Sequence, residues 1–139
     1  MQNREEKAVS LFKCYSCAQA VFVAYAPLFG MDEEIALKLA TPFGGGMGGM
    51  REVCGAVSGM FMVVGLAKGT AIPNDKEGKK QCFEQVQLLA EKFRQENGSI
   101  ICKQLLGLEP GLPEGYDKKP CIERVKCCVR LIEENILVE

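Results

Sequence analysis

The sequence predicts an all-α fold, a single compact domain of five or six helices that spans residues 1–139. Apolar residues recur every three or four positions along most of the chain, which is the spacing of one face of a helix. Short segments rich in glycine and proline separate these stretches, and no segment sustains the alternation of a β-strand. A chain of 139 residues is also long enough to enclose a hydrophobic core.

The first two predicted helices lie in the N-terminal third of the chain. Residues 4–29 carry a continuous apolar face, and Pro27 and Gly30 end this helix. Residues 31–43 form the second helix, in which Asp32 is a suitable N-cap because its carboxylate can accept a bond from a free backbone N–H.

The third and fourth predicted helices flank a loop at residues 69–75. The third, residues 50–68, is apolar nearly all round, so we expect it to be central. The fourth, residues 75–95, has the clearest amphipathic pattern and ends at Gly98. Its apolar stripe consists of Phe83, Val86, Leu89, Ala90 and Phe93.

The C-terminal part contains a short helix and a long one. Ser99 is the predicted N-cap of the short helix, residues 100–106. A loop with two prolines and two glycines follows at residues 108–119. The last helix, residues 120–137, begins with Pro120, since proline suits the first helical position.

The composition excludes several classes of protein. The net charge is -1, so the composition gives no sign of the basic surface that binds nucleic acid. We interpret the charged segment KKPCIERVK as a solvated helix face. The N-terminus has no apolar core of a signal peptide, and the longest apolar run is too short to span a membrane. We therefore expect a cytoplasmic protein with no membrane insertion, in which the eight cysteines remain mostly reduced.

The sequence contains no histidine. This excludes Cys/His and Ser/His/Asp catalytic sites, Cys₂His₂ zinc sites and histidine-ligated haem. The segment CYSCA also lacks the histidine of a C-x-x-C-H motif, so no c-type haem is expected.

Three cysteines lie close to predicted helix starts. These are Cys54, Cys102 and Cys121, and the free N–H groups of a helix N-terminus stabilise a thiolate there. Cys14 and Cys17 form a C-x-x-C pair that shares one face of the first predicted helix. The remaining cysteines, Cys82, Cys127 and Cys128, are interpreted as packing residues.

The glycine-rich segment before Cys54 contains a G-x-G-x-x-G match at Gly44, Gly46 and Gly49. A nucleotide site would need a preceding strand or a following lysine, and both are missing. We instead expect these glycines to adopt positive φ angles and to bring the chain to the helix that carries Cys54.

Small residues follow directly after Cys54. Gly55, Ala56 and Gly59 predict that a neighbouring helix or a cofactor comes close to this face, since each glycine weakens a helix by about 1 kcal/mol relative to alanine.

Together these motifs resemble a known family. Residues 54–59 read Cys-Gly-Ala-Val-Ser-Gly, which matches a CGAxxG motif, and FGGGMGGM precedes it. Cys17 in SCAQAVF, Cys102 in GSIICKQLLG and Cys121 in KKPCIERV match three further signature cysteines. The chain is thus similar, over nearly its whole length, to the bacterial and archaeal redox-active proteins named for the pattern C_GCAxxG_C_C. Cys14, Cys82, Cys127 and Cys128 lie outside this pattern.

The resemblance implies a redox-active protein in which Cys17, Cys54, Cys102 and Cys121 converge. In one mechanism these thiols cycle between dithiol and disulfide, with Cys54 or Cys102 attacking, which would make the chain a thiol-dependent oxidoreductase. In another, the same four cysteines bind zinc or an iron–sulfur cluster. The third hypothesis is that the chain is a non-enzymatic helical module for binding or dimerisation, with most of the cysteines in its core.

The sequence does not identify the redox partner or substrate. The helix faces of small residues, and a likeness to the dimeric split-Soret cytochromes, are compatible with a homodimer.

Overall fold

The described part of the chain is all-α, with seven α-helices and two short 3₁₀ helices. The computed structural model describes residues 3–109 and 120–137. The elements are α1 (Arg4–Phe12), α2 (Cys17–Tyr25), η1 (Ala26–Phe29), α3 (Glu33–Ala40), η2 (Thr41–Phe43), α4 (Gly55–Lys68), α5 (Lys76–Asn97), α6 (Cys102–Leu105) and α7 (Cys121–Asn135). The predicted fold class is confirmed, whereas the predicted number of five or six helices is too low.

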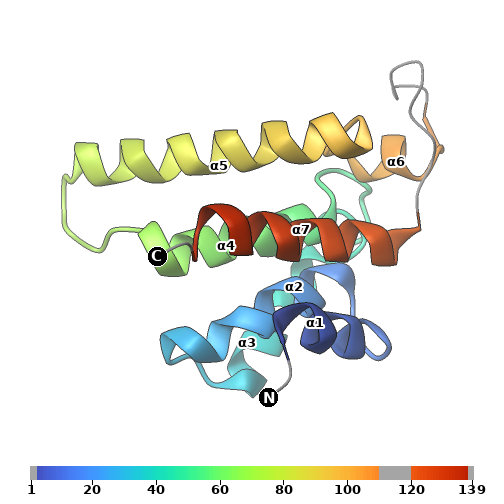
Figure 1. Cartoon of the computed structure of the whole chain (residues 1–139), viewed down its shortest axis with the longest axis horizontal. Coiled ribbons are helices and arrows are strands. Elements are labelled where there is room, and N and C mark those ends of the chain that lie inside the picture. Colours follow the sequence, from blue (N-terminus) through green and yellow to red (C-terminus); the bar gives the residue numbers. More distant parts are fainter. Residues whose placement is uncertain (1–2, 110–119, 138–139) are drawn as a thin grey trace.

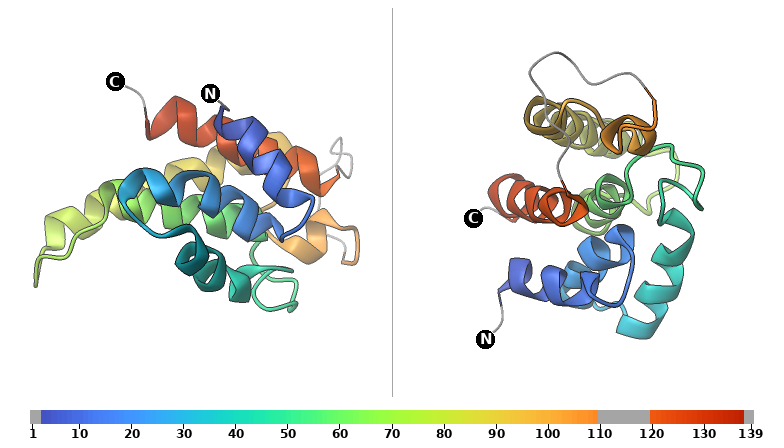
Figure 2. Two further views of the ribbon diagram at one scale, coloured as in Figure 1. Left: turned by 90° about the horizontal axis from the view of Figure 1, so that it is seen from below. Right: turned by 90° about the vertical axis from the view of Figure 1, so that its right-hand side faces the viewer.

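Helix α4 occupies the centre of the molecule. Figure 1 shows α5 and α6 above it, α7 beside it and α1 to α3 below, and Figure 2 gives the same arrangement from two further sides. Met60, Val63 and Val64 of α4 are completely buried. The nearly uniform apolar composition of this segment therefore correctly predicts a central helix.

The closest helix contact joins α2 to α4, and two glycines of α4 make it possible. A β-carbon added at Gly59 would lie 2.8 Å from the carbonyl oxygen of Ala18, and one added at Gly55 would lie 3.3 Å from the backbone nitrogen of Ala18. Because a side chain at either position would push α2 away, the glycines explain how the two backbones approach so closely.

The glycine-rich loop before α4 adopts an unusual backbone. Five consecutive residues, 45–49, have φ between 61° and 81°, and four of them are glycine. The prediction of positive φ angles is thus confirmed for Gly46 and Gly49, but it is wrong for Gly44, whose φ is -66°. At Gly46 an added β-carbon would lie 2.7 Å from the β-carbon of Cys102, so this glycine also lets the loop pack directly on α6.

Helix α5 matches its prediction closely at both ends. Asp75 caps it by accepting a bond from the Gly78 N–H at 2.8 Å, and Gly98 ends it with φ 90°. Its stripe is buried at Leu89, Ala90 and Phe93, whereas Phe83 is 55% exposed. In α3, Asp32 likewise accepts a bond from the Ile35 N–H at 3.1 Å, as predicted for an N-cap.

The single helix predicted for residues 4–29 is wrong. The chain leaves α1 after Phe12 and starts again at Cys17, because Ser16 and Gln19 form a capping box. Ser16 accepts from the Gln19 N–H at 3.3 Å, and Gln19 accepts from the Ser16 N–H at 3.0 Å. The S-x-x-Q pattern was visible in the sequence. Cys14 and Cys17 therefore do not share a helix face.

Three other predicted boundaries need correction. Helix α4 starts five residues later than the predicted residue 50, because Val53 forms an antiparallel bridge with Ile101. Ile101 and not Ser99 is the N-cap of α6, while Ser99 accepts a bond from the Ile101 N–H at 2.9 Å. Pro120 is the N-cap of α7 and not its first residue. Most of the predicted loop 108–119 lies outside the described residues.

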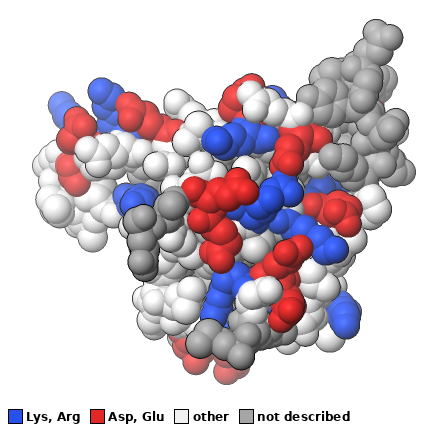
Figure 3. Space-filling model, in the orientation of Figure 1, with Lys and Arg blue, Asp and Glu red and all other residues white. Residues whose placement is uncertain are grey.

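The surface carries charges of both signs. Figure 3 shows acidic and basic side chains interspersed over the face of Figure 1. The interpretation of KKPCIERVK as a solvated face fails for Arg124, which is only 2% exposed. Within residues 3–109 and 120–137, no helix is long and apolar enough to cross a bilayer.

Two glycines of α4 give a matched test of the helix contact. We expect Gly59→Ala to lower the free energy of unfolding by about 1–3 kcal/mol, because its β-carbon has no space against α2. Gly65→Ala, where a β-carbon meets nothing within 4 Å, should raise it by about 0.5–1 kcal/mol. Urea unfolding followed by circular dichroism measures both. A destabilisation of equal size in the two variants would contradict this account.

Candidate functional site

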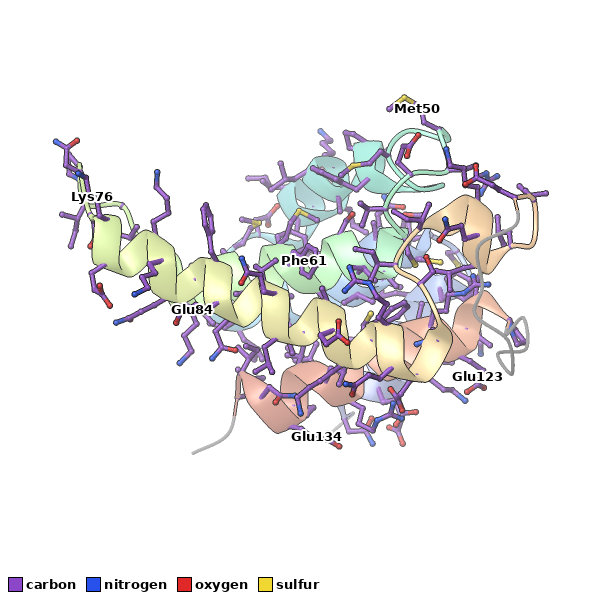
Figure 4. All side chains as sticks on the ribbon, turned by 90° about the horizontal axis from the view of Figure 1, so that it is seen from above. Met50, Phe61, Lys76, Glu84, Glu123 and Glu134 are labelled. Carbon is purple, nitrogen blue, oxygen red and sulfur yellow. The ribbon has the colours of Figure 1, made fainter. Side chains whose placement is uncertain are left out.

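All four predicted signature cysteines lie at the start of a helix. Cys17 is the first residue of α2, Cys54 is the N-cap of α4, and Cys102 and Cys121 are the first residues of α6 and α7. The sequence predicts only three of them near helix starts, because the apolar pattern continues across the break before Cys17. The helix starts of α4 and α7 lie at the end of the molecule that Met50 and Glu123 mark in Figure 4, opposite Lys76 at the start of α5.

An antiparallel bridge brings Cys54 next to Cys102. Val53 and Ile101 are the bridged residues, and the flanking hydrogen bonds run from the Cys54 N–H to the Ile100 carbonyl at 2.7 Å and from the Cys102 N–H to the Glu52 carbonyl at 2.5 Å. This pairing puts the two cysteines on the same side of the ribbon as diagonal neighbours, a separation of about 7–8 Å between α-carbons. Residues 48 positions apart in the sequence are thereby adjacent.

Cys17 and Cys121 form a second pair. The side chain of Cys17 forms a hydrogen bond with that of Cys121, and the charge of a Cys54 thiolate also acts on Cys17. Both side chains are partly exposed, whereas Cys54 and Cys102 are buried. The structure therefore brings the four cysteines together, with one pair near the surface and one pair in the interior.

A buried arginine lies beside the outer pair. The Nη1 of Arg124 donates to the Cys121 sulfur at 3.0 Å, and its Nη2 donates to the Leu105 carbonyl at 3.1 Å. Arg124 thus ties the first turn of α7 to the end of α6 and holds a positive charge against the thiol. Arg124 is not among the residues predicted for the site, although its position three residues after Cys121 puts both on one helix face.

The two thiols of the outer pair have opposite protonation preferences. The hydrogen bond from Cys17, followed by the charge of Arg124, lowers the pKa of Cys121 to about 5. The same hydrogen bond, together with burial, raises the pKa of Cys17 far above its usual value. At neutral pH the pair therefore consists of a Cys121 thiolate and a Cys17 thiol that donates to it.

Burial decides the protonation of Cys54. Desolvation raises its pKa, and the N–H groups of Val57 and Ala56 offset this only in part. The pKa of Cys121 is thus lowered, as predicted, but by Cys17 and Arg124 and not by the N–H groups of the helix start. The predicted low pKa of Cys54 is wrong, because burial there outweighs the helix terminus.

The remaining cysteines take no part in the outer pair. Cys14 is exposed, three residues before Cys17. Cys128 is fully buried, and burial raises the pKa of its thiol. Cys127 donates to Glu96 at 2.7 Å, and burial raises its pKa to about 12. Cys82 packs against the core, in agreement with its interpretation as a packing residue.

Within the described residues, no group of three or more His, Cys, Asp or Glu side chains is arranged to hold a metal ion. Zinc or iron–sulfur ligation by Cys17, Cys54, Cys102 and Cys121 thus stays a prediction. Gly55 and Gly59 face α2, so helix packing accounts for both residues. A cofactor contact at Gly55, Ala56 and Gly59 also stays a prediction.

The sequence matches a known protein family over most of its length. A family model described as "Putative redox-active protein (C_GCAxxG_C_C)" matches residues 15–135. The chain belongs to this family. The matched range includes all four signature cysteines. No curated protein and no solved structure matches the chain.

The protonation of Cys121 predicts its reactivity. Because its pKa is lowered to about 5, Cys121 should remain a thiolate above that pH and lose reactivity as the pH falls through it. We expect the rates of its alkylation by iodoacetamide at pH 6 and at pH 8 to differ by no more than about threefold. Mass spectrometry of the digested protein measures the rate at each cysteine.

Cys127 provides an internal control for this experiment. Its pKa of about 12 and its burial predict slow labelling at both pH values. A tenfold or greater drop in Cys121 labelling from pH 8 to pH 6 would show that the thiol has an ordinary pKa of about 8.5.

Proposed function

We propose that the chain is a thiol–disulfide oxidoreductase that acts through Cys121 and Cys17. One observation carries the proposal: the Cys17 thiol is hydrogen-bonded to Cys121, and Arg124 donates to the Cys121 sulfur at 3.0 Å. Such a pair supplies both groups that disulfide exchange needs, an attacking thiolate and a neighbouring thiol. We also propose a cytoplasmic location, where thiols are kept reduced.

The roles of the two cysteines follow from their environments. Cys121 attacks, because it is the thiolate and is partly exposed. Cys17 resolves the resulting mixed disulfide, since its sulfur is adjacent and keeps its proton until then. This assignment replaces the expectation that Cys54 or Cys102 attacks, which burial disfavours.

Cys54 and Cys102 complete the proposed cluster as an inner pair. This pairing is supported by the position of both cysteines on the same side of the bridge between Val53 and Ile101. The electrostatic interaction between Cys54 and Cys17 links the inner pair to the outer pair. In this proposal a Cys17–Cys121 disulfide passes inward by exchange, which regenerates the outer dithiol as the inner pair becomes oxidised.

The alternative of a zinc or iron–sulfur site has less support, because no three described ligands are arranged around one position. Metal analysis and a visible spectrum of anaerobically purified protein test this alternative. Stoichiometric zinc or iron would overturn thiol exchange as the main function.

A binding or dimerisation module without redox chemistry is the remaining alternative. The Arg124 contact argues against it, since a charged group held against a thiol is costly in a passive core. Failure of Cys121 to react faster than Cys82 with alkylating agents would favour this module. The redox partner and a homodimer stay predictions.

The proposal predicts which disulfide forms first. Limiting diamide added to the reduced protein should yield a Cys17–Cys121 disulfide before any other, because these two side chains already interact and one of them is a thiolate. Cys17→Ser should trap a mixed disulfide between Cys121 and a small thiol, and Cys121→Ser should abolish both products. Non-reducing peptide mapping identifies each species.

Cys14→Ser is the matched control. It removes an exposed thiol three residues from Cys17 and outside the cluster, so it should leave the product unchanged. A first disulfide that joins any other two cysteines would refute the assigned pair.

A further inference from the structure

Arg51, at the end of the glycine-rich loop, is held in place by its backbone. Its N–H donates to the Gly45 carbonyl and its own carbonyl accepts from the Lys103 N–H, both at 3.0 Å. Its φ is 62°, in the left-handed region that costs a residue with a β-carbon roughly 1–3 kcal/mol. Such strain persists where the surrounding structure imposes it, and it concentrates at functional sites.

The side chain of Arg51 reaches the cysteine cluster. Its Nη1 lies 3.8 Å from the sulfur of Cys102, and its charge also favours the thiolate of Cys121. No carboxylate within residues 3–109 and 120–137 forms an ion pair with it, whereas its neighbour Glu52 pairs with Lys103 at 3.4 Å. Arg51 is an exposed residue, so solvent reaches this side chain beside the thiols.

The two arginines of the cluster differ in what they can do. Arg124 is buried and its fork already holds the Cys121 sulfur and the Leu105 carbonyl. Arg51 is an exposed residue, and among the described residues the one hydrogen bond of its guanidinium is a long contact to a thiol. A guanidinium in that position matches a carboxylate, which it binds with two parallel hydrogen bonds.

From this geometry, and building on the proposed function, we propose that the oxidant is a small disulfide with a carboxylate close to its sulfurs, oriented by Arg51. The Cys121 thiolate attacks one sulfur of R–S–S–R and forms Cys121–S–S–R, while R–S⁻ leaves and takes a proton from solvent. Cys17 then loses its proton and attacks the Cys121 sulfur, which releases the second R–S⁻. One protein dithiol is oxidised and two molecules of R–SH form.

Three small disulfides that differ in charge test this inference. Dithiodiglycolate carries two carboxylates, bis-hydroxyethyl disulfide is neutral and cystamine carries two ammonium groups. Each is mixed with the reduced full chain at neutral pH, and the rate of modification at Cys121 is followed by mass spectrometry. The readout is the rate with dithiodiglycolate divided by the rate with bis-hydroxyethyl disulfide. This ratio is then divided by the ratio that free mercaptoethanol gives with the same two disulfides. This ratio does not depend on how much of Cys121 is a thiolate.

We expect the normalised ratio to be on the order of ten for the natural chain and about one for Arg51→Ala. It should fall as salt is raised, because Arg51 is exposed and its charge is screened. Cystamine should show the opposite preference. A ratio near one in the natural chain, or an equal ratio in Arg51→Ala, would overturn the inference.

Matched variants separate charge from folding. Arg51→Lys keeps the charge and should retain most of the ratio, and both substitutions keep a β-carbon at the strained position. Lys103→Ala removes a nearby charge that Glu52 and Glu109 already pair, so it should leave the ratio unchanged. Absence of any reaction at Cys121 with all three disulfides would instead overturn the proposed function itself.

Discussion

The close contact between α2 and α4 is the constraint on which the rest of the structure depends. Gly59 and Gly55 remove the side chains that would separate the two backbones at Ala18. Cys17 directly precedes Ala18 and Cys54 directly precedes Gly55, so the same contact brings these two cysteines together. The glycines of the CGAxxG motif therefore act on the thiols through helix packing, whereas their entropic penalty is offset by burial along α4.

Three elements add the remaining groups around this contact. The bridge between Val53 and Ile101 places Cys102 next to Cys54. Gly46 of the glycine-rich loop packs against Cys102. Arg124 ties α7 to α6 and so fixes Cys121 at the edge of the cluster. Burial and charge then divide the four thiols. Cys121 is partly exposed, and its interactions with Cys17 and Arg124 stabilise its thiolate. Cys17 and the more deeply buried Cys54 have raised pKa values and retain their protons.

Much of the fold was predictable because it depends on local signals. Asp32 and Gly98 begin and end helices through bonds to residues within a few positions, and both were predicted correctly. The start of α5 was predicted to within one residue, since Asp75 is its N-cap. The capping box at Ser16 was equally local, yet the continuous apolar pattern across it concealed the break. The late start of α4 could not be read, since it results from pairing with Ile101 far along the chain.

The sequence by itself determined the helical class, the absence of histidine chemistry and the four cysteines of the family pattern. It could not decide their roles, because helix starts look alike in sequence whether they are buried or exposed. Only the tertiary structure separated Cys121 from Cys54, since desolvation and the Arg124 charge depend on which segments pack around each sulfur. The position of Arg51 beside Cys102 likewise exists only once the loop and α6 are in contact.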